Sequence, residues 1–359
     1  MKTPLFVILL VFALLPTYAG SKQEATPVGR DRVVTLMTQN VYHGVDAELN
    51  DVAAGGFADL LANVAAVYQG YLERDFPSRA EAFADQIELV RPDLIALQEA
   101  ILVRTQAPPD GPATPATTVA LDYVELLLDA LAARGLQYEV VVQLPNFDVE
   151  LPSALGFDVR HTDRSAILAR ADLKTSEFRL SNAQAGNFAT NCTLPTGIGA
   201  ITFLRGWASV DVKIRGKSFR FISTHLDFAC LQFTTAIQQA QAAELLGGPA
   251  ATTLPVVLAG DFNSAADGSG ASYNDLTAAG FSDAASEAGI GDLPTCCQDP
   301  DLLNAVSTLD TRIDLVLFRG GFSVIDAEVL GDEPPDRTPS GLWPSDHAGV
   351  AAALVLPHP

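Results

Sequence analysis

Apolar runs of strand-like length that end in a polar side chain recur along the chain and constrain its fold most strongly. The clearest run covers residues 255–259, five apolar positions that require a buried core, and Gly260, Asp261 and Asn263 follow it. We expect Gly260 to let the backbone turn tightly. Because alternate residues past a strand end tend to share a face, Asp261 and Asn263 are predicted to converge on one point. Taken alone, the stretch is explained equally well by an ordinary Asp/Asn turn.

Other apolar runs end in the same way. They cover Arg32–Asn40, Asp93–Glu99, Phe219–Thr224, Arg312–Phe318 and Gly349–Leu356. The polar residues at or beside all of these runs are Asn40, Glu99, His225, Asp261, Asn263, Asp314, Asp346 and His347. One such residue is usually a turn or a cap, but eight are hard to explain in that way. The set therefore predicts a functional site at the ends of several strands.

Helical patterns alternate with the strand-like runs over the whole length. Apolar residues at spacings of three and four predict helices within residues 51–90, where Pro77 opens a second helix and Pro92 stops it. Further helices are predicted at Val119–Arg134, Gln232–Leu246 and Tyr273–Ala279, further strands at Tyr138–Leu144, Arg164–Arg170 and Trp207–Ile214, and loops or irregular segments at 107–118, 146–163 and 181–199. This interleaving favours one layered α/β domain over two separate ones.

The charge balance limits the classes of partner. The 359-residue chain carries a formal net charge of −21. Such an acidic protein is unlike one with a broad basic groove for nucleic acid. It still permits a phosphate substrate, provided that divalent cations lie between the protein and the phosphate.

The N-terminus has the pattern of a secretory signal. Lys2 precedes the apolar run Leu5–Leu15, and the small-residue site Thr17–Ala19 follows. The run is short for a membrane span, although an uncleaved anchor is the alternative interpretation. We expect residues 1–19 to be removed, residues 20–359 to form the mature domain, and the protein to be secreted or periplasmic. No other stretch reads as a membrane span.

The four cysteines are Cys192, Cys230, Cys296 and Cys297. An even number in an exported protein suggests disulfides. Because adjacent cysteines seldom bond to each other, we expect two bridges that tie the loops at 192 and 230 to the loop at 296–297. Free buried thiols are the alternative. A zinc site is disfavoured, since no paired C-x-x-C spacing is present.

The eight polar residues share one kind of chemistry. Carboxylates are the hard oxygen ligands that Mg²⁺ and Mn²⁺ prefer. Histidines donate to phosphate oxygens or relay protons, and an asparagine steadies a water or a phosphoryl oxygen without adding charge. The sequence contains no serine nucleophile elbow, no Gly-rich phosphate loop and no H-E-x-x-H element.

The order of motifs N-V, L-Q-E, T-H-L, G-D-F-N, R-I-D-L-V and S-D-H resembles the endonuclease/exonuclease/phosphatase superfamily. The resemblance extends from Val33 to Leu356 and suggests a secreted, bacterial-type member. It implies a deoxyribonuclease I-like fold, a four-layer α/β/β/α sandwich with two packed mixed β-sheets. It also implies a hydrolase of phosphoric esters that uses Mg²⁺, or alternatively Mn²⁺ or Ca²⁺.

For the metal and the attacking water, the resemblance implies four roles. Glu99 is the main metal ligand, with Asn40 beside it. Asp261 orients or deprotonates the attacking water. Asn263 holds a phosphate oxygen in the transition state.

For the phosphate, the resemblance implies roles for the other four residues. His347 contacts the phosphate and is oriented by Asp346 as a His–carboxylate pair. His225 is the second phosphate histidine and acts on the leaving oxygen. Asp314 supports a histidine or the metal shell.

Other polar residues are weaker candidates. His43 and Asp46 follow Asn40 closely enough to reach the site. The segment with His161, Asp163 and Arg164 either lines the cleft or, as we favour, forms a solvated loop. The remaining residues considered are Asp227, expected to be structural, His358, expected to have no role, and Trp207 and Phe219, expected in the core.

The substrate is left open by the sequence. The expected activity is hydrolysis of a phosphodiester or phosphomonoester by in-line water attack, by either a nuclease or a sphingomyelinase-like or phospholipase C-like lipid phosphodiesterase. A catalytically silent binding protein is the alternative from another class. The helical insert 47–90 and the loop 107–118 are expected to shape the pocket, and residues 228–233 are a candidate membrane-docking loop. We expect a monomer without an obligate protein partner.

Overall fold

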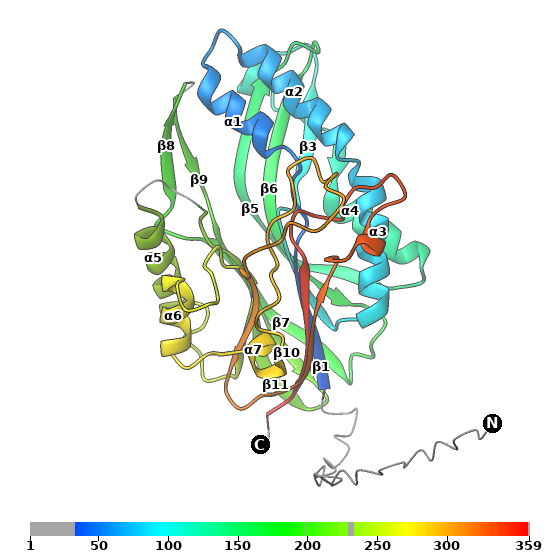
Figure 1. Cartoon of the computed structure of the whole chain (residues 1–359), viewed down its shortest axis with the longest axis vertical. Coiled ribbons are helices and arrows are strands. Elements are labelled where there is room, and N and C mark those ends of the chain that lie inside the picture. Colours follow the sequence, from blue (N-terminus) through cyan, green and yellow to red (C-terminus); the bar gives the residue numbers. More distant parts are fainter. Residues whose placement is uncertain (1–32, 198, 229–232, 358–359) are drawn as a thin grey trace, which may run out of the picture.

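The computed structural model describes residues 33–197, 199–228 and 233–357. Two β-sheets pack face to face in the middle of the molecule, and helices cover their outer faces (Figure 1). Both sheets are mixed, because each contains one parallel pair among antiparallel neighbours. The predicted four-layer α/β/β/α sandwich is confirmed.

The first sheet has eight strands in the order β15-β16-β1-β2-β6-β3-β4, and β5 pairs separately with β6. Its strands are β1 (Val33–Asn40), β2 (Leu94–Gln98), β3 (Leu102–Gln106), β4 (Thr118–Asp122), β5 (Tyr138–Pro152), β6 (Asp158–Arg170), β15 (Ser323–Leu330) and β16 (Gly349–Val355). Strands β1 and β2 run parallel, so both deliver their carboxyl ends to one edge of the sheet.

The second sheet has six strands in the order β13-β14-β12-β11-β10-β7, and a separate hairpin is formed by β8 and β9. These strands are β7 (Phe178–Asn187), β8 (Cys192–Thr196), β9 (Gly199–Phe203), β10 (Gly206–Ile214), β11 (Lys217–His225), β12 (Val256–Asp261), β13 (Ser282–Asp283) and β14 (Asp314–Arg319). Strands β11 and β12 form the parallel pair.

The helices lie mostly in two outer layers. They are α1 (Asp46–Gly55), α2 (Leu60–Glu73), α3 (Phe76–Val90), α4 (Tyr123–Ala133), α5 (Thr234–Gly247), α6 (Ala271–Ala278) and α7 (Ala284–Ala288), with 3₁₀ turns η2 (Gly111–Ala113) and η4 (Pro334–Asp336). Apolar faces of α1–α4 pack on the first sheet, and those of α5 and α6 pack on the second. The short α7 packs against β14 and β15 instead. Between the sheets lies a third apolar layer, to which Leu36, Ile167, Phe221 and Val257 belong.

Three of the predicted irregular or helical segments are wrong. Residues 146–163, predicted as a loop, form the outer parts of the long β5–β6 hairpin. Residues 181–199 contribute to β7 and contain β8. The predicted helix Val119–Arg134 starts only at Tyr123, because residues 118–122 pair with β3. Hydrogen-bonded neighbouring strands stabilise these polar segments, as where Asp148 pairs with Thr162 across the β5–β6 hairpin, and apolar periodicity does not record such pairing.

Gly260 has a different role from the predicted turn. It lies inside β12, where it is paired with Thr224 of β11. A Cβ atom at this position would lie 2.0 Å from the Thr224 carbonyl oxygen. Only glycine therefore allows the two strands to approach so closely just before their site residues.

The cysteine pairing also differs from the prediction. Cys296 is bonded to Cys297, so neither can bridge to the loops at 192 or 230. Cys192 takes part in a disulfide as well, whereas Cys230 lies outside the described residues. The predicted signal at 1–19 and His358 also lie outside them. Among the helices of the described ranges, none has the length and apolarity needed to span a bilayer.

Candidate active site

All eight predicted site residues lie at one common edge of the two packed sheets. The first sheet contributes Asn40 at the end of β1, Glu99 after β2, and Asp346 and His347 before β16. The second sheet contributes His225 at the end of β11, Asp261 and Asn263 at and after the end of β12, and Asp314 at the start of β14. The site is therefore assembled by the packing of one sheet on the other.

The two halves are joined by the side-chain amide of Asn40. Its nitrogen donates to Glu99 Oε1 at 3.3 Å and to Asp261 Oδ2 at 3.0 Å. Its oxygen accepts the backbone N–H of Tyr42 at 3.0 Å, which determines the orientation of the amide. Because both carboxylates bind one nitrogen, they lie well within the roughly 8 Å that a hydrated ion and a phosphate can span.

His347 is oriented by Asp314 and not by Asp346 as the sequence predicted. Its Nδ1 lies 2.8 Å from Asp314 Oδ2, and Asp314 is fully buried. Asp346 Oδ1 lies 4.0 Å from the other ring nitrogen, beyond hydrogen-bonding distance. Nε2 of His347 also lies 3.9 Å from Asp261 Oδ2, so the ring edge with this atom faces the centre of the site.

Both ring nitrogens of His225 are occupied by protein groups. Arg205 approaches Nδ1 at 3.2 Å, and because a guanidinium only donates, Nδ1 must be the unprotonated acceptor. Nε2 then carries the hydrogen and lies 3.3 Å from Asp261 Oδ2. His225 thus positions the Asp261 carboxylate, and in this geometry it has no ring nitrogen left for the leaving oxygen.

Asn263 closes the turn after β12. Its backbone N–H donates to Asp261 Oδ1 at 2.9 Å, and its side-chain amide donates to the Leu226 carbonyl at 3.1 Å. An amide has two N–H donors, so one remains for a phosphate oxygen. Asn263 is partly exposed, which leaves that donor accessible.

Three non-glycine residues at strand ends in this region have left-handed backbone conformations. The φ angles are 54° for Tyr42, 56° for Glu99 and 48° for Asn263. This region is uncommon for residues with a Cβ atom, and such strain clusters at functional sites. The surrounding hydrogen bonds hold these turns in place, including that of the His43 N–H to Glu99 Oε2 at 3.0 Å.

Burial and neighbouring charges shift the pKa values of the central groups. Burial and the adjacent Asp314 carboxylate raise the pKa of Asp261 to about 7. Burial also raises the pKa of Asp346 to about 7, and Glu99 adds to the shift. For His347, burial opposes the charged form, but Asp314, Asp346 and Asp261 outweigh it and hold its pKa well above the ordinary value.

The same forces keep His225 neutral. Burial, together with the positive charge of Arg205, holds the pKa of His225 well below its ordinary value. The site therefore combines a cationic His347 with a neutral His225. It also holds an acid, Asp261, that changes protonation near neutral pH.

The weaker candidates lie around this centre and not in a solvated loop. His43 Nε2 lies 3.0 Å from Asp46 and 3.7 Å from Glu99. His161 and Asp163 are buried within β6, where the Tyr71 hydroxyl lies 2.5 Å from His161 Nδ1. The predicted loop is wrong here because β6 pairs with β5 and β3 on its two sides.

Two further residues beside the centre have structural contacts. Arg164 is buried and donates to the backbone carbonyls of Ala100 and Ile101. Asp227 is fully buried and accepts the Cys192 N–H, which agrees with its expected structural role.

Arg79 is a positioning residue that the sequence interpretation missed. It is fully buried on α3 and donates to the backbone carbonyls of Arg74, Val41, Tyr42 and Pro344 at 2.8–3.0 Å. These bonds tie the turn after β1 to the segment just before Asp346. A signal existed: Arg79 follows Phe76 by three residues and precedes Phe83 by four, which puts it on the apolar face of the helix.

The donor set fits a hard divalent cation. Asp261, Asp314 and His347 form a buried group whose ligand atoms all lie within 4.8 Å of one another, and because His347 is cationic the metal donors of this group are its carboxylate oxygens. Asp314 Oδ1 is buried without a hydrogen-bond partner among the described residues. Glu99 and Asn40 add oxygen donors of the kind that Mg²⁺ prefers.

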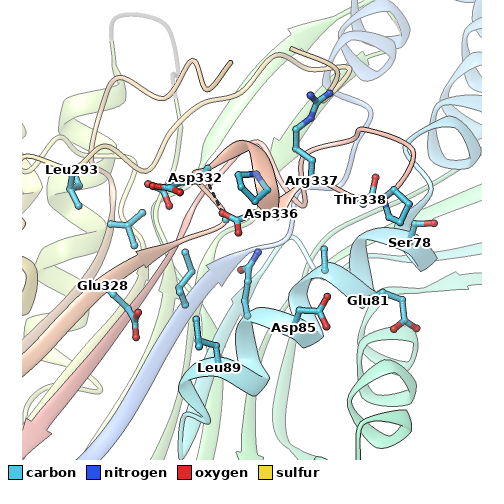
Figure 2. Close-up of a pocket in the computed structure, with 18 of the residues that line it drawn as sticks. Ser78, Glu81, Asp85, Leu89, Leu293, Glu328, Asp332, Asp336, Arg337 and Thr338 are labelled. Atoms are coloured by element: carbon cyan, nitrogen blue, oxygen red, sulfur yellow. Dashed lines mark hydrogen bonds between the residues drawn. The ribbon is translucent and has the colours of Figure 1, made fainter. Parts of the chain in front are cut away.

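A separate groove of about 890 Å³ lies between α3 and the segment that follows β15 (Figure 2). None of the eight site residues is among the described residues that line it. Its acidic lining residues are Glu81, Asp85, Glu328, Asp332, Glu333 and Asp336, against two arginines, Arg134 and Arg337. This negative lining would repel a phosphate, so the groove is not the phosphate site.

Solved structures share this fold. A Bacteroides thetaiotaomicron protein of the endonuclease/exonuclease/phosphatase family is similar at 18% identity and a TM-score of 0.56, covering 91% of this chain and 98% of that one. D. rerio TDP2 complexed with single strand DNA product is similar at 17% identity and a TM-score of 0.53, covering 90% and 98%. The human Nocturnin catalytic domain with bound sulfate anion is similar at 15% identity and a TM-score of 0.53, covering 91% and 94%.

The sequence of the chain matches a protein-family model but no curated protein. The family model described as Endonuclease/Exonuclease/phosphatase family matches residues 37–347, which include all eight site residues. By this match and by its architecture, the chain belongs to the endonuclease/exonuclease/phosphatase family.

Proposed function

We propose that this protein is a divalent-metal-dependent phosphoesterase that hydrolyses a phosphodiester or phosphomonoester by in-line attack of water. One observation carries the proposal: Asp261, Glu99 and His347, which come from both sheets, converge on a single buried point. A carboxylate that changes protonation near pH 7, beside a cationic imidazole, is suited to activate water and to bind a phosphate.

Each residue has a role that follows from its contacts. Asp261 accepts the proton of the attacking water. With a pKa of about 7, its carboxylate is partly deprotonated at neutral pH and still basic enough to take that proton. Asn40 and His225 hold its Oδ2 in place at 3.0 Å and 3.3 Å. His347, fixed by Asp314, donates from Nε2 to the phosphate, and the spare N–H of Asn263 donates to another phosphate oxygen.

Glu99 and Asn40 would hold the divalent cation, for which we favour Mg²⁺ over Mn²⁺ or Ca²⁺. When bound, the cation neutralises phosphate charge and polarises the phosphoryl oxygen. This role also reconciles a net charge of −21 with an anionic substrate.

A direct test uses a generic phosphodiester, bis(p-nitrophenyl) phosphate, with EDTA-treated protein before and after addition of Mg²⁺. We expect turnover only with Mg²⁺ and at least a hundredfold loss in Asp261→Asn. The exposed Asp267→Asn is the matched control and should keep wild-type activity. Metal-independent turnover, or unchanged turnover in Asp261→Asn, would refute the proposal. Absence of any turnover would favour a silent binding protein.

The substrate class is the finer question. The similarity to a TDP2 structure with a single strand DNA product favours a nucleic-acid or nucleotide substrate over a phospholipid. A panel of single-stranded DNA, duplex DNA, sphingomyelin vesicles and inositol phosphates, each with Mg²⁺, compares the two classes. Preferential hydrolysis of sphingomyelin would reverse this preference.

We also propose that the protein is exported as a monomeric enzyme, residues 20–359 forming its one catalytic domain after removal of residues 1–19. The pattern from Lys2 to Ala19 supports this, as do the disulfides at Cys192 and at Cys296–Cys297, which are typical of oxidising compartments. N-terminal mass analysis of protein from the extracellular or periplasmic fraction tests the cleavage site. An intact Met1 in that fraction would contradict it.

A further inference from the structure

A continuous row of aromatic rings borders the site. The aromatic row contains, in order, His43, His161, Phe147, Phe203 and Phe228. Successive ring centroids lie 5.9, 5.8, 5.2 and 5.8 Å apart. Because attractive ring pairs have centroids roughly 4.5–7 Å apart, the five rings form one connected row. His161 is buried within it, whereas Phe147, Phe203 and Phe228 are partly exposed.

Each end of the aromatic row touches a group of the proposed site. At one end, the His43 ring lies 3.7 Å from Glu99. At the other end, the Arg205 guanidinium lies 5.7 Å from the centre of the Phe228 ring and 3.2 Å from His225 Nδ1. A group attached to the scissile phosphate can therefore reach the row without leaving the site.

Two buried polar atoms beside the row have no partner among the described residues. Arg205 Nε is an unpaired donor, and Asp163 Oδ1 is an unpaired acceptor. Arg205 and Asp163 contact each other through their other atoms at 3.2 Å, and the Asp163 side chain is only 5% exposed. Buried polar atoms are nearly always hydrogen-bonded, so a donor and an acceptor left open together indicate a polar ligand.

The fourth ring of the row, that of Phe203, is held in place by its hairpin. Phe203 ends β9, and the tip of the β8–β9 hairpin is anchored to α1, where the Gly197 N–H donates to the Ala53 carbonyl at 2.7 Å. A Cβ atom on Gly197 would lie 2.6 Å from the Gly56 nitrogen, so this contact is close. In Figure 1 the hairpin rises from the second sheet toward α1. The aromatic row is thus built on anchored elements.

We propose that the aromatic row, with Arg205 and Asp163, is a subsite for an unpaired nucleobase attached to the scissile phosphate. This inference rests on the phosphoesterase function proposed above. A base presents a flat face for stacking and, in its plane, donors and acceptors that match the two open polar atoms. A lipid acyl chain would satisfy the rings but leave both polar atoms unpaired.

The base must be unpaired in order to stack in this way. In a duplex both faces of a base are covered by neighbouring pairs, whereas an end or a single strand leaves a face free. The net charge of −21 also disfavours a long polyanion, whose binding depends on many basic contacts. The substrate class is therefore a nucleotide ester or a single-stranded end.

Matched dinucleotides test the subsite. The full protein with Mg²⁺ is given a dithymidine monophosphate and two analogues that lack one base, replaced by a tetrahydrofuran sugar on the 5′ or the 3′ side. The phosphate and backbone stay the same, so only the missing base changes. Loss of the base that occupies the row should lower kcat/KM by about tenfold to a hundredfold, and loss of the other base much less.

Substitutions at Phe203 test whether the aromatic row causes the loss of kcat/KM on removal of the base. Phe203→Ala, and Phe203→Leu as a variant that keeps apolar bulk, should abolish the difference in kcat/KM between dinucleotide and analogue. Phe57→Ala, at a position that is 75% exposed and outside the row, is the matched control and should keep the difference. A Phe203 variant that keeps the difference overturns the subsite.

Binding separates this inference from the proposed function. Calorimetric titration with thymidine monophosphate and with tetrahydrofuran phosphate tests the subsite even if no ester is hydrolysed. Tighter binding of the thymidine compound, lost in Phe203→Leu, supports the inference without turnover. Equal binding of the two phosphates overturns the subsite. A Phe203→Ala variant that loses hydrolysis of sphingomyelin vesicles but keeps hydrolysis of the dinucleotide also overturns it, because that result would assign the row to lipid.

Discussion

The contact of His347 with Asp314 leads to a quantitative prediction. Asp314 is fully buried, its Oδ2 lies 2.8 Å from Nδ1 of His347, and among the carboxylates that raise the pKa of this ring its effect is the largest. Asp314→Asn keeps the shape of the side chain but removes its charge. The ring then loses both a charge-assisted hydrogen bond and the main reason for its protonation.

The size of the effect follows from that bond. A hydrogen bond to a charged group contributes about 1.5–3 kcal/mol, which corresponds to roughly tenfold to 150-fold in rate when it stabilises the transition state. The pH profile should change as well. In wild type the raised pKa keeps His347 cationic far above pH 6.5, whereas in the variant the ring loses its proton nearer pH 6.5, so activity falls at a lower pH.

The assay combines kinetics with an NMR measurement of the His347 pKa. We expect kcat on a generic phosphodiester at saturating Mg²⁺ to fall by the factor above in Asp314→Asn, and the His347 pKa measured by NMR to move down. Asp346→Asn is the control, because Asp346 lies 4.0 Å from the other ring nitrogen and should lower that pKa less. An Asp314→Asn enzyme with unchanged kcat, or a larger pKa shift in Asp346→Asn, would refute the assignment.

Three other outcomes can be measured separately. Arg79→Met leaves four buried carbonyls without their donor and should lower the free energy of unfolding in urea by at least about 3 kcal/mol, whereas the exposed Arg91→Met should change it little. Burial lowers the pKa of His161 to about 3, so below pH 6.5 the unfolded chain binds a proton that the folded protein does not, and the folded state loses stability. Between pH 7 and pH 5 the free energy of unfolding of wild type should therefore fall by about 2 kcal/mol relative to His161→Phe in the same measurement. Glu99→Gln should weaken Mg²⁺ binding to EDTA-treated protein at least about tenfold by calorimetry, and Asp267→Asn should not. A stable Arg79→Met protein, a His161→Phe protein with the wild-type pH dependence, or unchanged Mg²⁺ affinity in Glu99→Gln would each contradict its prediction.

From the sequence, local patterns predicted one layered α/β domain and the polar residues at its strand ends, and the family resemblance implied the four-layer sandwich. An apolar strand followed by a polar residue is a local pattern, and parallel strands in a packed sheet must end near one another. Asn40 and Glu99 could therefore be placed together from their parallel strands, whereas Asp261 ends a strand of the other sheet and meets them only through sheet packing. The helices of the 47–90 insert were predictable for the same reason, since their apolar spacing is also local.

Only the tertiary structure decided which side chains meet. Asp314 lies 33 residues before His347 and Asp346 lies next to it, yet Asp314 holds the ring, because the packing of β14 against the β16 edge brings it there. The long β5–β6 hairpin was missed because pairing across the hairpin and with β3, not apolar periodicity, makes its polar ends into strands. The aromatic row is likewise assembled from separate strands and loops, and no spacing within the chain records that Phe147 and Phe203 stack. Strand ends are encoded locally, whereas contacts between strands depend on sheet order, register and sheet-on-sheet packing.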